Sequence, residues 1–141
     1  MKYLMLLLYL AAFSSVAFID NNCKEPHSGT AIAMTDKMSD ILNIDKNTIV
    51  KEKTKAELIF NEPVNDILSG QYALETLKNA QSEKIPRLKE LFSQYNARNL
   101  IIKFTFRSVD NKEDVFLVSA IANDYECDVN FNGFITVKRE F

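Results

Sequence analysis

The chain has 141 residues, with 17 basic and 19 acidic side chains and a formal net charge of −2 at pH 7. A chain of this length is expected to fold as one domain and can bury roughly two thirds of its unfolded surface. The charges are mixed along the sequence, which argues against a nucleic-acid-binding protein and against a basic membrane-surface patch.

Residues 1–17 have the three parts of an export signal. Lys2 provides the positive start, an uncharged apolar run extends from Tyr3 to Phe13, and small residues occupy the expected cleavage position, from Ser15 to Ala17. A retained membrane anchor is the alternative, but a span needs about 20 apolar residues and this run is shorter. We therefore expect cleavage of the signal and an exported protein, periplasmic or secreted, without a stable membrane anchor.

The only two cysteines are Cys23 and Cys127. In an oxidising compartment the simplest inference is one disulfide between them, and the alternative is two separate thiols. The bridge would close a loop of about a hundred residues, which in the chain-entropy model stabilises the fold by roughly 4 to 5 kcal/mol. It would attach the segment 18–34, which we expect to be an irregular N-terminal arm, to the C-terminal region.

The middle of the chain alternates between helical and extended patterns. A short helix is expected to begin with Thr35 as its N-cap and to end near Ile44. Residues 48–60 are β-rich at both ends and charged in the middle, which favours an edge strand, although a partly helical segment fits as well. Two helices with apolar stripes are predicted at 66–81 and around 86–95.

From residue 100 the apolar period changes from 3.6 to 2 residues. Residues 100–107 and 115–122 predict two strands of a hairpin. The segments 125–131 and 134–141 predict a second hairpin. We expect residues 35–141 to form a single α+β domain in which a four-stranded antiparallel meander packs against two or three helices. This layout resembles the cystatin-like and nuclear-transport-factor-like groups, where a curved antiparallel sheet wraps a helix.

The stretch DVNFNG, from Asp128 to Gly133, resembles the first half of an EF-hand calcium loop. Asp128, Asn130 and Asn132 would occupy the first three ligand positions. The bidentate glutamate position, however, holds Arg139, and we expect no helix after the loop. Asn132-Gly133 also fits the two positive-φ positions of a type I′ hairpin turn. We therefore predict a turn and no metal site.

No set of residues in the sequence points to catalysis or to a cofactor. His27 is the only histidine, and a nucleophilic pair with Cys23 would require that cysteine to be reduced. A zinc site needs more Cys and His than the chain contains. Phenylalanines on the expected strands could line a ligand pocket, but filling the core is their expected role. They are Phe104, Phe106, Phe116, Phe131 and Phe134.

The sequence thus favours a small exported binding protein without enzymatic activity, such as an inhibitor or immunity-type protein, that acts on a protein partner. Hairpin tips are exposed and easily adapted, so they supply the candidate binding residues. These are Asp110, Asn111, Lys112 and Glu113 at one tip and Asn132 and Gly133 at the other. The alternative is a carrier or enzyme with a pocket for an apolar small molecule between the sheet and a helix.

Overall fold

The computed structural model describes residues 19–77 and 82–141, so the predicted export signal lies outside the described residues. The main helices are α3 (Gly29–Asp40), α4 (Asp66–Leu77) and α5 (Ile85–Leu91). The strands are β1 (Lys55–Pro63), β2 (Arg98–Arg107), β3 (Glu113–Ala122) and β4 (Asn130–Lys138). Short helical turns occupy Ile19–Cys23, Lys46–Thr48, Lys51–Lys53 and Ser82–Lys84.

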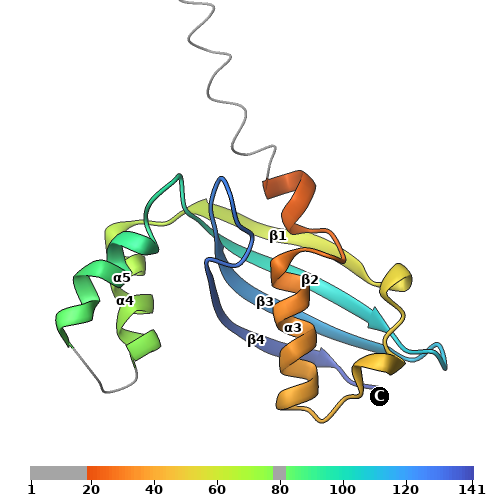
Figure 1. Ribbon diagram of the computed structural model, residues 1–141. Helices are drawn as coiled ribbons and strands as arrows, with labels where there is room; N and C mark the ends of the chain where they lie inside the picture. The colour runs from red at the N-terminus through yellow and green to blue at the C-terminus, as the bar shows by residue number, and fades with distance from the viewer. Residues whose placement is uncertain (1–18, 78–81) are drawn as a thin grey trace, which may run out of the picture.

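The strands form one antiparallel meander in the order β1-β2-β3-β4 (Figure 1). The prediction of an α+β fold with a four-stranded antiparallel sheet and helices packed against it is therefore confirmed. The finer likeness to cystatin-like or nuclear-transport-factor-like layouts stays a prediction.

The second predicted hairpin is wrong, because β4 is one continuous strand that contains Asn132 and Gly133. Ser119 lies opposite Gly133 and Ala120 lies opposite Phe131, so Asn132 is an extra residue in a β-bulge. Phe131 and Phe134 are three residues apart and would face opposite sides of a regular strand. The bulge turns the side chains of Phe131 and Phe134 toward the core. A hairpin would place these two side chains on one face as well, so the sequence pattern fits a bulged strand and a hairpin equally.

The first strand of the meander is instead β1, which overlaps the segment 48–60 that was predicted as an edge strand. It pairs antiparallel with β2, from Lys55 opposite Thr105 to Pro63 opposite Arg98. Ile59 is an extra residue between Leu58 and Phe60, so β1 also carries a bulge.

The N-terminal arm is less irregular than predicted, because α3 begins at Gly29, within the segment 18–34. The Ser28 side chain accepts a hydrogen bond from Ala31 N at 3.2 Å and caps the helix. Thr35, predicted as the N-cap, lies inside the helix, where its hydroxyl donates to Ala31 O at 2.9 Å. The helix ends at Asp40, before the predicted Ile44.

The main core lies between α3 and the sheet. Met34 and Met38 of α3 are fully buried against Phe104 and Phe116, and Phe106 is also buried. Phe104, Phe106 and Phe116 thus fill the core as predicted, whereas Phe131 and Phe134 are only half-buried and pack against the same cluster.

The helices α4 and α5 pack together at one end of the sheet (Figure 1). Their cluster buries Ala73 and Phe92 with Ile121 at the end of β3. Helix α4 matches the described part of the prediction, whereas α5 ends at Leu91, before the predicted residue 95. The chain leaves α5 through Tyr95 and Asn96, which both have positive φ.

The predicted disulfide between Cys23 and Cys127 is confirmed, with the two Cα atoms 5.1 Å apart. It joins the turn before α3 to the loop that precedes β4. Thr30 of α3 strengthens the same junction, because its hydroxyl donates to Cys127 O at 2.5 Å.

Candidate functional site

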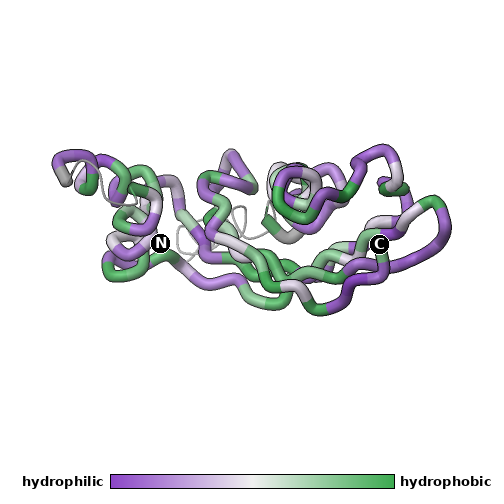
Figure 2. The backbone as a smooth tube through the Cα atoms, turned by 90° about the horizontal axis from the view of Figure 1, so that it is seen from below, coloured by the Kyte–Doolittle hydropathy of each residue, from purple (hydrophilic) through white to green (hydrophobic). Residues whose placement is uncertain are grey.

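One face of the sheet has no helix over most of its area. Figure 2 shows α3 and the 123–129 loop on the same side of the sheet, whereas the described residues place no helix beneath the centre of the other side. Along β2 the side chains alternate accordingly, with Ile102 and Phe104 buried under α3 and Ile101 and Lys103 on the opposite face. We call this opposite side the uncovered face.

Apolar side chains cross the uncovered face from one edge strand to the other. The cross-strand register places Phe60 opposite Ile101 and Leu117 opposite Ile135. The bulges add Ile59 and Val137 beside them. We define the apolar band as Ile59, Phe60, Ile101, Leu117, Ile135 and Val137.

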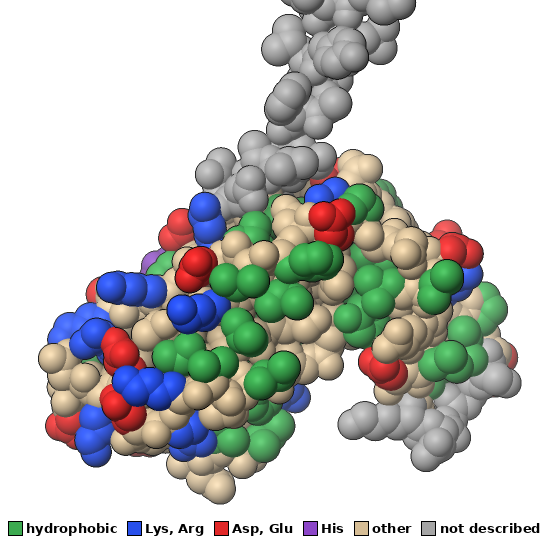
Figure 3. Space-filling model, turned by 180° about the vertical axis from the view of Figure 1, so that it is seen from behind, with side chains coloured by type: hydrophobic (Ala, Val, Ile, Leu, Met, Phe, Trp, Pro, Cys, Tyr) green, Lys and Arg blue, Asp and Glu red, His purple; other side chains and the backbone are tan. Residues whose placement is uncertain are grey.

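The apolar band is strongly exposed at the two edges of the sheet. The exposed fractions are 50% for Ile59, 41% for Phe60, 66% for Ile135 and 56% for Val137. Figure 3 shows hydrophobic side chains gathered diagonally across this side of the molecule, with most of the charged side chains to the left of them. Exposed apolar residues in a contiguous group mark interaction surfaces more often than single ones do.

The charges beside the apolar band are paired with one another. Lys103 lies 3.8 Å from Glu57, and Glu113 forms ion pairs with Arg107 and Lys138. The Glu140 carboxylate accepts a hydrogen bond from Glu113 N and pairs with Lys138, and these contacts lower the pKa of Glu140. Hydrogen bonds to Glu140 and Glu113 raise the pKa of Lys138, so Lys138 and Glu140 both stay ionised at neutral pH. The charged side chains beside the apolar band therefore add little net charge to the uncovered face.

A buried carboxylate anchors the C-terminal residues next to this network. Asp114 is fully buried, and its Oδ1 atom accepts hydrogen bonds from Glu140 N at 2.7 Å and Phe141 N at 3.1 Å. Arg139 Nε lies 2.9 Å from Oδ2, as an ion pair without hydrogen-bond geometry. The anchor holds the chain after β4 at the end of the sheet.

The two predicted sets of binding residues do not come together. Asp110, Asn111 and Lys112 form the exposed turn between β2 and β3, as predicted, while Glu113 begins β3 and belongs to the ion-pair network. Asn132 and Gly133 lie within β4 and not at a hairpin tip.

The residues considered for metal binding or catalysis have other roles. Asn130 Nδ2 donates to Asn132 Oδ1 at 2.7 Å, and Asn132 Nδ2 donates to Ser119 Oγ at 3.0 Å. In the described ranges 19–77 and 82–141, no cluster of three or more His, Cys, Asp or Glu side chains could hold a metal ion. The disulfide removes the thiol that a Cys23–His27 pair would require.

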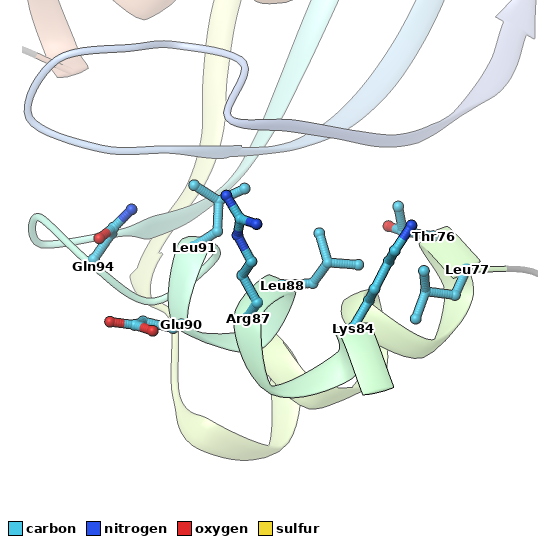
Figure 4. A pocket seen from close by; sticks show the side chains of 8 residues that line it. All are labelled: Thr76, Leu77, Lys84, Arg87, Leu88, Glu90, Leu91 and Gln94. Carbon is cyan, nitrogen blue, oxygen red and sulfur yellow. The ribbon is translucent and has the colours of Figure 1, made fainter. Parts of the chain in front are cut away.

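Several hollows interrupt the other surfaces. One of ≈ 300 Å³ lies between α3 and the segment 46–54, with Phe106 and Ile49 at its lining and the Asp36–Lys46 ion pair at its rim. A second, of ≈ 590 Å³, lies between α3, α4 and the start of β4. A third, of ≈ 680 Å³, lies beside α4 and α5 (Figure 4).

Comparisons of the chain with protein-family models, with curated proteins and with solved structures found no match. Among the described residues, no helix has the length and apolar character needed to cross a membrane.

The apolar band was not predicted from the sequence, although the sequence contains one signal for it. The strand 115–122 is a nearly continuous apolar run, and such a run is typical of a strand that is covered on both faces. In the structure α3 covers one face of β3, and the helix pair reaches only its end at Ile121.

Proposed function

We propose that this protein is an exported, non-enzymatic binding protein that holds a protein partner against the uncovered face of its sheet. The observation that carries the proposal is the apolar band, because it has members on all four strands and those on the two edge strands are exposed. Burying such a surface against a partner is favourable by roughly 25 cal/mol for each Å² of apolar area. The disulfide supports an oxidising, exported location.

The chemistry of the face indicates the kind of partner. Its charges are already paired within the chain, so a strongly charged partner gains little there. The fitting partner presents an apolar patch with a polar, nearly neutral rim, as the cores and rims of protein interfaces do. An inhibitor or immunity-type protein would block its target through such a contact.

The carrier alternative is supported by two hollows between the sheet and a helix: a larger one of ≈ 590 Å³ between α3, α4 and β4, and a smaller one between α3 and the segment 46–54. The volume of the smaller hollow, ≈ 300 Å³, is at the lower end of the range for small-molecule sites. The apolar band lies across a sheet face, and none of its residues lines the hollows described above, which favours a protein partner over a small molecule.

Placing a charge in the apolar band tests the proposal. Ile135→Lys and Ile59→Lys change exposed positions at opposite edges of the sheet, and Ile67→Lys changes an apolar side chain of α4 that is 83% exposed. Each immobilised protein is exposed to the secreted or periplasmic fraction of the producing cells, and bound proteins are quantified by mass spectrometry. We expect a partner whose capture falls at least about tenfold, equivalent to about 1.4 kcal/mol, with both band variants.

The α4 variant is the matched control and should retain the partner. Equal capture by all the variants would contradict the proposal. Self-association that only the band variants abolish would assign the face to a second copy of the chain and would also contradict it.

A further inference from the structure

The two edge strands of the sheet differ in how they are protected. β1 carries Lys55, Glu57, Glu62 and Pro63, and such charges and prolines discourage further strand pairing. β4 has no charged residue and no proline from Asn130 to Val137. The protective features within this stretch are two bulges, at Asn132 and at Val137.

The outer edge of β4 is free to accept another strand. Within the described residues β4 pairs with β3 alone, because it is the last strand of the sheet. Its outward backbone N–H and C=O groups form a row without a neighbouring strand (Figure 1). Adding an extended segment to such an edge is an established mode of peptide recognition.

The surroundings of this edge provide space for the side chains of an added strand. The ≈ 590 Å³ hollow is lined by Phe131 and Phe134 of β4, by Ile41 beyond the end of α3, and by Tyr72 of α4. It adjoins the ≈ 680 Å³ hollow beside α4 and α5, since Thr76 lines both. Alternate side chains of an added strand would enter the first hollow, and the others would continue the apolar band beyond Ile135.

The charges of the two hollows favour an acidic segment. Lys37, Lys84 and Arg87 line them, and none of the three forms a side-chain ion pair with another described residue. In Figure 4 the side chains of Lys84 and Arg87 extend to the same side as Leu88 and Leu91, whereas Glu90 points elsewhere.

The hollows also contain two carboxylates, those of Glu75 and Glu90. Glu75 Oε1 accepts a hydrogen bond from Gln71 Nε2 at 2.9 Å. Because this partner is a neutral amide, Glu75 keeps its charge. The two hollows together carry three cations and two carboxylates, which leaves a net positive charge.

We propose that the free edge of β4 binds an extended, acidic segment of the protein partner as a fifth strand, with its carboxylates next to Lys84 and Arg87. This inference rests on the proposed function and specifies how the partner is held. Backbone hydrogen bonds to β4 supply affinity, and the hollows supply specificity for alternate side chains.

Two matched peptides test this inference by NMR on the isotope-labelled protein. The first is acetyl-Glu-Val-Thr-Val-Thr-Val-Glu-amide, and the second has lysine in place of both glutamates. We expect the acidic peptide, at about 1 mM, to shift and to protect from exchange the backbone amides of β4. The lysine peptide should bind at least about tenfold more weakly.

Charge reversal at the helix pair provides the matched variants. The double substitution Lys84→Glu with Arg87→Glu should reverse the preference between the two peptides. Lys53→Glu, an exposed position that lines neither hollow, should leave it unchanged.

Each other outcome overturns the inference. Equal binding of both peptides would show that the edge of β4 has no preference for an acidic segment. Shifts confined to the methyl groups of Ile101 and Leu117 would show that the face binds without the edge, and the proposed function would survive. If neither peptide shifts any amide of β4, the addition of a fifth strand is excluded. The proposed function is then tested by the lysine substitutions in the apolar band alone.

Discussion

Gly133 has a backbone conformation that favours glycine, whereas Gly70 has a helical one that does not. Gly133 has a φ of 148° at the bulge of β4, in a region that other residues rarely adopt, whereas Gly70 lies inside α4 with open space where a Cβ would be. Gly133→Ala should therefore lower the free energy of unfolding by about 1 to 3 kcal/mol. Gly70→Ala should raise it by about 0.5 to 1 kcal/mol. Urea denaturation of both variants measures these changes, and a Gly133→Ala protein as stable as the wild type would contradict the bulge.

Asp128 makes the stability of the fold depend on pH. Partial burial, and then the negative charge of Glu126, raise the pKa of the Asp128 carboxyl above its ordinary value. The folded state therefore holds this proton more tightly than the unfolded state, and stability falls as pH rises from about 4 through the raised pKa. Asp128→Asn should be more stable than the wild type at pH 7 and equally stable near pH 3.

Thermal melting across this pH range compares the two proteins. The carboxylate also lies against Gly29 at the start of α3, where a helix end favours negative charge. Lower stability of the Asp128→Asn variant at pH 7 would show that the helix end outweighs burial and Glu126.

At the scale of elements, the disulfide holds the turn before α3 to the loop before β4. Replacing both Cys23 and Cys127 by alanine should lower the free energy of unfolding by about 2 to 5 kcal/mol, since the bridge closes a loop of 104 residues in sequence separation. Urea denaturation of the double variant, with the reduced wild type as its control, measures the loss. An unchanged midpoint in both would contradict a stabilising role for the bridge.

The sequence predicts elements well where one local pattern is sufficient. The period of two residues identified β2 and β3, and the polar residues between them identified their turn. It failed at β4 because Asn-Gly suits both a hairpin turn and a bulge, and only pairing with β3 decides between them. It failed at the start of α3 because Ser28 is a cap only in the context of the helix that packs on the sheet.

The candidate site depends on packing that no local pattern contains. The period of two residues shows that β2 has two faces, but whether Ile101 is exposed depends on where the helices pack. Asp114 shows the same dependence, since its carboxylate is buried only because the C-terminal residues fold back onto it.

At the scale of the whole molecule, the distribution of helices determines which surface is available. α3 covers one face of the sheet, and α4 and α5 cover one end, so the chain leaves an apolar band across the other face (Figures 2 and 3). A sheet with apolar residues on both faces needs a second layer. In our account the protein partner supplies that layer.

Site-specific photo-crosslinking is the most direct test of this account. A benzophenone amino acid replaces Ile135 in the apolar band, Ile67 on α4, or Val109 beside the β2–β3 turn, all of which are exposed. After irradiation in the secreted or periplasmic fraction, we expect a crosslink to one partner from position 135 and none from positions 67 and 109. A crosslink from position 109 without one from position 135 would place the partner at the hairpin tip and contradict the account.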